Sequence, residues 1–326
     1  MYMVFTLLLS WLTLTAADST PPITPTVTTS GGPFITEPES VNLPTITITQ
    51  TLPVHDDGSI FLATFRGFND RITPNYLIIL DGNGEYLYFT RTPENRIAMD
   101  FKATAVAGTP KLSYFVTDVF RAAWGEGEFR VLDSGYQEID RWTASPPYVA
   151  ENHELLMLDN GNALLMAYHP IIMDLTAHGG KADAQVIDVV IQELTPARTV
   201  LFSWHSLDRV PVTSTYVSLT TDLVDYAHAN SLAVDTDGNL LVSLRNTSQV
   251  LKIKRSTGEI LWQLGGKAND FTFVNDDGFA FQHDVRRLPN GNLTLFDNGN
   301  GLHPDYSRAV EYEINEATKT ITRTWQ

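Results

Sequence analysis

Three segments in the last two thirds of the chain repeat one pattern, and each places a polar residue at the same point of it. His153, Asn230 and His283 each lie eight residues before the glycine of a Gly-Asn turn, and a run of apolar residues follows each turn. Repeats of this kind predict separate strands that present equivalent positions to one axis. We therefore expect these three side chains to meet at equivalent depth in a ring of strands, as a candidate active site.

Short β-type runs separated by Gly, Asn and Asp follow one another without a long helical period, which predicts a nearly all-β protein. Five predicted hairpins end on an aromatic residue, and four of these residues are tryptophans spaced by 62, 58 and 63 residues: Trp142, Trp204, Trp262 and Trp325. This spacing suits a four-stranded unit, and radial stacking of such units gives a β-propeller. We expect five visible blades and six in a complete protein. A β-sandwich is the alternative, although it needs no fixed period.

The composition limits the kinds of partner. The chain of 326 residues is 43% hydrophobic and has a formal net charge of -16, so it can bury a large core. Nucleic acid and anionic membrane surfaces would repel it at long range. The absence of cysteine from the sequence excludes disulfides and thiolate chemistry. The oligomeric state stays open.

The N-terminal region predicts export. Residues 1–17 have the length and apolar character of a signal peptide, although no Lys or Arg precedes Arg66, so an uncleaved membrane anchor is the alternative. A Ser/Thr/Pro-rich spacer follows at residues 18–43. The catalytic propeller would then occupy residues 44–326. Because the chain stops on the last predicted strand of a unit, we expect a C-terminally truncated propeller in a secreted protein, extracellular or periplasmic.

Residues near the repeated positions form a candidate oxyanion site. His228 and Asn230 are two residues apart, so they would point the same way along a strand. Arg245 ends the following strand, which a hairpin returns to the start of the first. His283 and His153 would complete a cluster without carboxylates. Imidazole, amide and guanidinium groups donate hydrogen bonds to a tetrahedral oxyanion, and an imidazole nitrogen is also a competent nucleophile at neutral pH.

The residues by themselves leave several functions open. The cluster suits transfer of a sulfuryl, phosphoryl or acyl group through a histidine, or hydrolysis with water as acceptor. A metal hydrolase with histidine ligands and a secreted, non-catalytic binding or scaffold propeller are further alternatives. Gly265-Gly266-Lys267 ends a predicted strand but lacks the upstream glycine of a phosphate-binding loop. We therefore expect no nucleotide, no other cofactor and no metal.

The most specific motifs of the chain are DYAHANSLAVDTDGNLLVSLRNTSQVLKI, EILWQLGGK and FAFQHDVRRLPNGNLTLFDN. They resemble those of the arylsulfotransferase family, secreted or periplasmic propellers that move a sulfuryl group between phenols without a nucleotide donor. The resemblance spans about residues 58–326. It implies an aryl sulfate and a phenol as small-molecule substrates.

The resemblance also implies roles for individual residues. His283, in the Gln-His-Asp match, resembles the family's nucleophile, which forms a transient sulfohistidine. His228 and Arg245 would assist the transfer as catalytic residues, and His153 and Asn230 would bind the substrate. His153 is in addition our candidate for the acid that protonates the leaving oxygen.

Overall fold

The computed structural model of the chain describes residues 43–44, 46–47, 58–64, 75–93, 96–121, 124–300 and 305–326. The predicted signal peptide and all but the last residue of the predicted spacer lie outside these ranges. The described part consists of strands and three short 3₁₀ helices: η2 (Thr176–His178), η3 (Ser206–Asp208) and η4 (Val212–Ser214). It contains no helix long and apolar enough to cross a membrane. The all-β prediction is confirmed.

The first sheet has three antiparallel strands in chain order. They are β1 (Ile60–Ala63), β2 (Tyr76–Leu80) and β3 (Tyr86–Arg91). Every residue of β2 is buried, and such a continuous apolar run needs cover on both faces. Leu77 and Ile79 pack with Tyr114 and Val116 of the following sheet, which provides one of these covers.

The second sheet joins two consecutive antiparallel runs. The first run is β4 (Ile97–Val106), β5 (Thr109–Phe120), β6 (Gly125–Leu132) and β7 (Glu138–Trp142). The second run is β8 (Ala150–Met157), β9 (Ala163–Met173), β10 (Ala184–Leu194) and β11 (Val200–His205), and the short β12 (Leu223–Val224) pairs in parallel with β10. The runs meet where β6 pairs with β8. The junction requires a glycine at position 127, because a Cβ atom on Gly127 would lie 2.1 Å from the Val116 carbonyl oxygen.

The third and fourth sheets are formed by one further run each. The third is β13 (Ala229–Val234), β14 (Leu240–Leu244), β15 (Gln249–Ile253) and β16 (Ile260–Gly265). The fourth has β18 (His283–Arg287), β19 (Leu293–Asp297), β20 (Arg308–Asn315) and β21 (Thr320–Trp325), with β17 (Thr272–Val274) parallel to β21. The described chain thus follows the predicted succession of antiparallel units.

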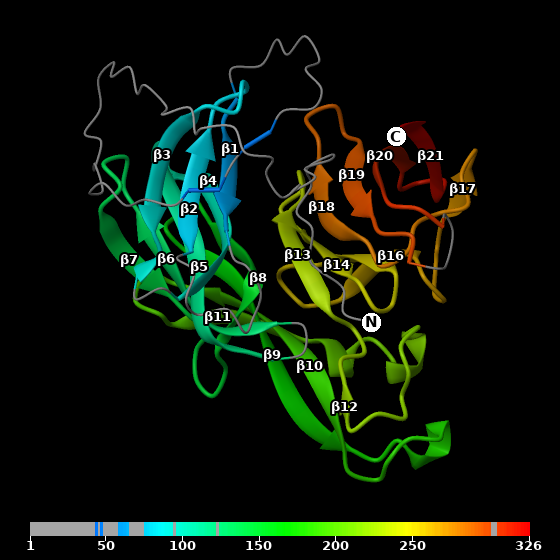
Figure 1. Ribbon diagram of the computed structural model, residues 1–326. Coiled ribbons are helices and arrows are strands. Elements are labelled where there is room, and N and C mark those ends of the chain that lie inside the picture. Colours follow the sequence, from blue (N-terminus) through cyan, green and yellow to red (C-terminus); the bar gives the residue numbers. More distant parts are fainter. Residues whose placement is uncertain are drawn as a thin grey trace, which may run out of the picture.

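The first strands of successive runs lie next to one another. In chain order, β1 contacts β4, β4 contacts β8, β8 contacts β13 and β13 contacts β18. In Figure 1, β1–β8 and β13–β21 form two flanks that are connected through β9 and β10. Neighbouring first strands are the arrangement that a radial stack of units requires. A closed ring and its number of blades stay predictions.

The tryptophans that set the period lie on the last strand of each run: Trp142 on β7, Trp204 on β11, Trp262 on β16 and Trp325 on β21. Two of them contact the outer turn of the next run. The Arg198 guanidinium carbon is 3.5 Å from the centroid of the Trp142 ring, and Trp204 Nε1 donates a hydrogen bond of 3.1 Å to the Gly258 carbonyl. Both tryptophans are buried, and truncation of a buried Trp to Ala costs about 3–5 kcal/mol. The aromatic period therefore reflects contacts that hold successive units together.

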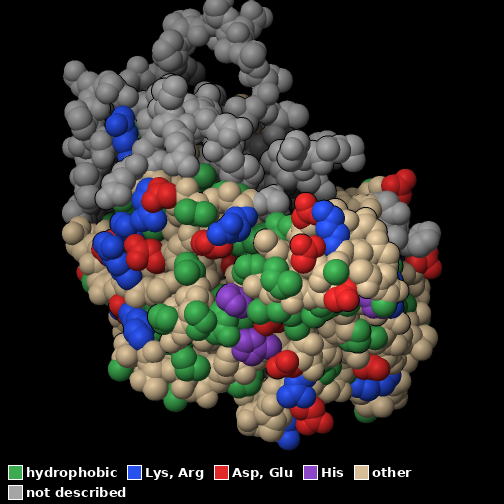
Figure 2. All heavy atoms as spheres, turned by 90° about the horizontal axis from the view of Figure 1, so that it is seen from below, with side chains coloured by type: hydrophobic (Ala, Val, Ile, Leu, Met, Phe, Trp, Pro, Cys, Tyr) green, Lys and Arg blue, Asp and Glu red, His purple; other side chains and the backbone are tan. Residues whose placement is uncertain are grey.

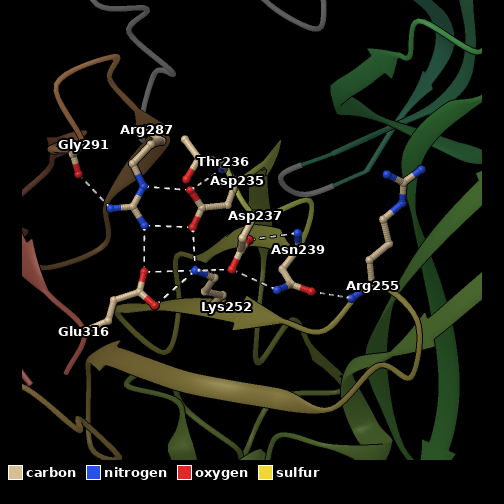
Figure 3. A network of polar contacts seen from close by, with 9 residues as sticks. All are labelled: Asp235, Thr236, Asp237, Asn239, Lys252, Arg255, Arg287, Gly291 and Glu316. Atoms are coloured by element: carbon tan, nitrogen blue, oxygen red, sulfur yellow. Dashed lines mark hydrogen bonds and ion pairs between the residues drawn. The ribbon is translucent and has the colours of Figure 1, made fainter.

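A buried ion network joins the third sheet to the fourth (Figure 3). The Lys252 ammonium lies 2.9 Å from one oxygen of Asp235 and 3.0 Å from one oxygen of Glu316. Arg287 donates two hydrogen bonds of 2.8 Å to the same Asp235 carboxylate. Burial alone would raise the pKa of Asp235, but the bonds from Arg287 and Lys252 outweigh burial and hold the pKa well below its usual range. The network therefore keeps this carboxylate charged while it ties β13, β15 and β18 together.

Charged side chains of opposite sign are mixed on the described surface. On the face shown in Figure 2, Lys and Arg side chains lie beside Asp and Glu side chains, and hydrophobic side chains lie between them. Ion pairs such as Arg121 with Glu126 and Arg198 with Asp140, each at 2.5 Å, illustrate the pairing. This face therefore offers no broad basic patch of the kind that binds a nucleic-acid backbone.

Candidate active site

Three histidines gather where the first strands of neighbouring runs lie side by side. His153 lies in β8, His228 immediately precedes β13, and His283 is the first residue of β18. The rings of His153 and His228 meet edge to face, with centroids 5.2 Å apart and planes at 76°. His283 begins β18, which packs against β13, and Asn230 of β13 donates a hydrogen bond of 2.7 Å to the carbonyl of Gln282, the residue before His283. The fold therefore brings the two histidines of the sequence repeat, His153 and His283, together with His228, which lies two residues before Asn230.

The strand pairing is irregular at each of these three places, with a β-bulge in β13 and in β18 and a wider break in β8. The pairing register shifts between Ala150 and Leu155 in β8, between Ala229 and Ser231 in β13, and between His283 and Arg286 in β18. Left-handed backbone at His228 (φ 53°) and at Asp284 (φ 55°) accompanies the two bulges. Bulges re-aim side chains and are common next to active sites. The strict alternation of faces, on which the pairing of His228 with Asn230 was predicted, therefore does not apply here.

Carboxylates hold two of the three histidines through Nδ1. One Glu151 oxygen bonds Nδ1 of His153, and the other accepts the backbone N–H of that residue at 3.0 Å. Nδ1 of His228 lies 2.5 Å from an oxygen of Asp225. Because a carboxylate only accepts, Nδ1 carries the proton and a neutral ring has its lone pair on Nε2. The prediction of a cluster without carboxylates is wrong, since these two acids bind the ring nitrogens directly.

An amide holds the third histidine. Nδ1 of His283 lies 2.7 Å from the side-chain oxygen of Asn298, which again places the lone pair of the neutral ring on Nε2. Burial lowers the pKa of His283 to about 3, and the neighbouring imidazoles add to the decrease. The hydrogen bond with the neutral Asn298 amide raises the pKa of His283, but by less than burial lowers it. His283 is therefore neutral throughout the physiological pH range.

The two carboxylate-bound histidines differ in protonation. Burial lowers the pKa of His153, but the charge and hydrogen bond of Glu151 outweigh burial and raise the pKa above its usual value. At His228 burial wins over the opposing effect of Asp225, and the pKa is lowered. One cluster thus contains a histidine that favours its proton beside two that release it. Such separation is the pattern that assigns acid and nucleophile roles.

Arg245 lies where the predicted hairpin returns it. Its backbone N–H donates to the His228 carbonyl at 2.9 Å, and its guanidinium donates to the Asn246 side-chain oxygen at 2.7 Å. The guanidinium carbon lies 4.9 Å from the centroid of the Phe281 ring. Burial lowers the pKa of Arg245 and the charge of Asp225 opposes this, but a guanidinium remains charged in proteins. A half-buried cation near His228 and His283 suits the binding of an oxyanion.

Asn230 makes a positioning contact. Its side-chain Nδ2 donates to the Gln282 carbonyl oxygen at 2.7 Å, and the residue is buried. Gln282 in turn donates from Nε2 to the Ser243 hydroxyl at 3.0 Å and to the Gln249 carbonyl at 2.9 Å. Asn230 therefore fixes the backbone immediately before His283. Direct contact of Asn230 with a substrate stays a prediction.

Two further residues of the site, Tyr168 and Asn298, were missed although the sequence contains their signal. Tyr168, Arg245 and Asn298 follow His153, Asn230 and His283, respectively, by fifteen residues. The Tyr168 hydroxyl donates to the Ala229 carbonyl at 2.5 Å, and its ring centroid lies 5.7 Å from that of His228. The spacing that relates Asn230 to Arg245 therefore also relates His283 to its anchor, and His153 to a tyrosine that packs against the cluster.

Pockets elsewhere contain none of these residues. Two surface depressions have volumes of about 390 and 250 Å³; the first is lined in part by Glu193 and Arg255 and the second by Trp142 and Arg198. Among the described residues, no group of three or more His, Cys, Asp or Glu side chains is arranged to hold a metal ion. The candidate site is therefore defined by its convergent polar groups.

Comparisons with known proteins agree with the motifs. A family model described as Arylsulfotransferase (ASST) matches residues 102–326. The arylsulfate sulfotransferase AssT of Escherichia coli O6:H1 is 30% identical over 137 residues, and that of Lelliottia amnigena is 26% identical over 136 residues. Each alignment covers 31% of this chain and 23% of the relative.

The chain therefore spans less than a quarter of the length of these relatives in alignment. A virginiamycin B lyase from Staphylococcus aureus has a TM-score of 0.42 and 10% identity, over 84% of this chain and 87% of that chain. Because the family model covers more than half of the residues, the chain belongs to the arylsulfotransferase family.

Proposed function

We propose that the chain transfers a sulfuryl group from an aryl sulfate to a phenol through a sulfohistidine on His283, without a nucleotide donor. The observation that supports this most directly is the state of His283. Its pKa is lowered to about 3 by burial, and Asn298 fixes the proton of the ring on Nδ1. A neutral imidazole with a lone pair on Nε2 is a competent nucleophile. Family membership supports sulfuryl rather than phosphoryl or acyl transfer.

In the first half-reaction, the Nε2 lone pair of His283 forms a bond to sulfur. The bond between sulfur and the aryl oxygen breaks, and its electron pair leaves on that oxygen. His153 is the proton donor to the leaving oxygen, because Glu151 outweighs burial and keeps the pKa of His153 above its usual value. A phenol departs and the sulfuryl group stays on His283.

In the second half-reaction, the hydroxyl of the acceptor phenol gives its proton to His153 and its oxygen bonds to sulfur. The nitrogen–sulfur bond breaks, and its electron pair returns to Nε2 of His283. Both enzyme residues thereby regain their starting states, as ping-pong transfer requires.

Arg245 and His228 stabilise the sulfuryl oxygens in this proposal. The charge on those oxygens is spread in the transition state, much as in phosphoryl transfer, so preformed donors reduce the barrier. Arg245 supplies a permanent cation. The anionic substrate and Asp225 together favour the protonated form of His228, in which Nε2 donates to a sulfuryl oxygen.

The test is turnover of 4-nitrophenyl sulfate by the wild type and by His283→Ala, with and without phenol. We expect phenol to stimulate nitrophenolate release, and the substitution to reduce release by at least about 10³-fold. Without an acceptor, the wild-type peptide that contains His283 should gain the mass of a sulfuryl group. The exposed His178→Ala provides the control, with unchanged rates.

Full activity of His283→Ala with a native circular dichroism spectrum would contradict the nucleophile assignment. Release that phenol does not stimulate would indicate water as the acceptor, and substrate binding without release would indicate a non-catalytic binding module. Inactivation by chelators would indicate a metal hydrolase.

We further propose that the units close into a propeller and that the protein is exported. Contacts between the first strands of successive runs support radial stacking, and residues 1–17 have signal-peptide character. N-terminal sequencing of the protein recovered outside the cytoplasm should give a chain that starts at Asp18. A start at Met1 would indicate the uncleaved anchor instead.

A further inference from the structure

The proposed mechanism does not use Gly265-Gly266-Lys267, yet this segment forms a turn that demands its two glycines. Gly265 and Gly266 have φ values of 81° and 65°, which residues with a Cβ atom rarely adopt. A Cβ atom on Gly265 would lie 2.6 Å from the Ser248 carbonyl oxygen, and one on Gly266 would lie 2.4 Å from the Thr247 carbonyl oxygen. The turn therefore fixes the direction in which Lys267 leaves β16.

Lys267 reaches from this turn to η4 and to the residue that follows it. Its ammonium donates to the carbonyl oxygens of Thr213 at 2.9 Å and of Thr215 at 2.6 Å, and it lies 5.0 Å from the centroid of the Tyr216 ring. No carboxylate of the described ranges lies within 4.0 Å of this ammonium. An ammonium has three N–H donors, so one remains for an anionic ligand. In a chain with a net charge of -16, a cation without an acidic partner is selective for anions.

Aromatic rings connect this cation to the candidate active site. The Tyr216 ring, 40% exposed, lies 6.4 Å from that of Phe281, measured between centroids. Phe281 in turn faces the Arg245 guanidinium at 4.9 Å. Phe281 has a left-handed backbone (φ 52°), held by a hydrogen bond of 3.2 Å from its N–H to the Ser248 hydroxyl. Strained backbone at a bulky residue is typical of functional sites. Here it directs the ring of Phe281, which directly precedes Gln282 and His283 in the chain, toward the Arg245 guanidinium.

We propose that Phe281, Tyr216 and Lys267 form a subsite for phenols that carry an acidic group at the end remote from the phenol oxygen. This inference rests on the proposed sulfuryl transfer. Arg245 holds the sulfuryl end, the two aromatic rings contact the aryl scaffold by stacking or edge-to-face packing, and the Lys267 ammonium binds the distant carboxylate or sulfonate. Because the path passes along two rings, the subsite favours extended aromatic acceptors over phenol itself.

The first experiment compares two extended acceptors of nearly the same shape, 3-(4'-hydroxybiphenyl-4-yl)propanoate and 3-(4'-hydroxybiphenyl-4-yl)propanamide, with 4-nitrophenyl sulfate as common donor. In ping-pong transfer, kcat/KM for the acceptor does not depend on the donor step. We expect the wild type to prefer the propanoate, and Lys267→Gln to reduce this preference about fivefold. Exposed Lys254→Gln serves as the matched control and should keep the preference. Equal effects of Lys267→Gln on both acceptors, or no effect on either, would overturn the proposal.

A second measurement separates failure of the subsite from failure of the proposed reaction. Calorimetry with His283→Ala and with the double variant His283→Ala/Lys267→Gln measures binding of the sulfate esters of both compounds without turnover. Preference for the propanoate ester that disappears in the double variant supports the subsite even if the wild type transfers no sulfuryl group. Turnover by the wild type together with equal binding of both esters would refute the subsite and leave the proposed function intact.

Discussion

The two ends of the same strands carry opposite electrostatic arrangements. Where β13 and β18 end, Asp235 and Arg287 meet Lys252 and Glu316, and each charge has an opposite charge at about hydrogen-bond distance (Figure 3). Where the same strands begin, three imidazoles and the Arg245 guanidinium lie close together, and fewer and weaker partners offset their positive charge. A repeated hairpin can therefore lock its turn end with ion pairs while its other end retains groups that bind and transform a ligand.

The pKa directions express this difference. At the turn end, burial lowers the pKa of Lys252, but bonds to Asp237, Asp235 and Glu316 outweigh it and raise the pKa. At the beginning of β18, burial prevails and His283 is neutral, with a pKa of about 3. The Lys252 ammonium has a full set of carboxylate partners and stays charged. His283 has only an amide partner, so its ring stays neutral and can act as a nucleophile. Substitutions at the two ends should therefore affect different properties of the protein.

The largest effect is expected for Glu151→Gln at the histidine end. The variant removes the charge that keeps His153 protonated, so burial lowers the pKa of His153 and less acid is available at neutral pH. Loss of an orienting carboxylate should reduce kcat about 10³-fold. The decline of kcat with rising pH should also begin at a lower pH, because it follows the pKa of His153.

Steady-state pH profiles and urea unfolding test this variant, with the exposed Glu313→Gln as the control that should leave both unchanged. A lower kcat with an unmoved basic limb would mean that Glu151 supports the fold near His153 but does not set its protonation.

The converse variant, Lys252→Met at the turn end, should affect stability and leave catalysis alone. It leaves three carboxylates without their buried ammonium, which costs about 3 kcal/mol of the free energy of unfolding. Urea titration measures the loss, and kcat below the transition should match that of the wild type. Asp237→Asn gives the control in the same network, since this side chain is 45% exposed and its pair with Lys252 is worth less than about 1 kcal/mol. A large fall in kcat for Lys252→Met would show that the two ends are coupled.

A smaller change, Asn298→Asp, should make the anchor of His283 resemble that of His153. The added carboxylate favours the protonated ring, so the pKa of His283 should rise from about 3 by about two units or more. Only the neutral ring attacks sulfur, and activity falls as pH decreases through this pKa. An acid limb in kcat/KM should therefore appear between about pH 5 and 7, whereas rates near pH 8 change little. Asn160→Asp, in an exposed turn, should show no such limb, and its absence from Asn298→Asp would refute the role of the amide.

Much of the architecture follows from local sequence. Alternating apolar runs and Gly-Asn turns predict antiparallel hairpins, and the spacing of Trp142, Trp204 and Trp262 marks the end of each run, as the structure has it. The hairpin of β13 and β14 brings Arg245 back toward Asn230 because the two strands have similar lengths, which the sequence also shows. The same count of fifteen residues relates His283 to Asn298, so the anchor of the proposed nucleophile was accessible to sequence analysis.

The carboxylate partner of His228 was not accessible in this way. Asp225 precedes His228 by three residues, which ideal alternation would place on opposite faces, whereas Glu151 precedes His153 by two residues, which alternation places on the same face. The bulge in β13 and the left-handed backbone of His228 make the contact with Asp225 possible. Such local departures are stabilised by packing between neighbouring runs and carry no periodic signal.

The sequence by itself determined the all-β class, the order of the antiparallel units, the family, and the histidines, arginine and asparagine of the candidate site. These properties depend on period, turn chemistry and short motifs, which are local. Only the tertiary structure decided which histidine has a carboxylate partner and which an amide, and that Lys267 lies along an aromatic path from Arg245. Burial and the positions of charges from other strands set each pKa, and both exist only once distant segments of the chain have packed together.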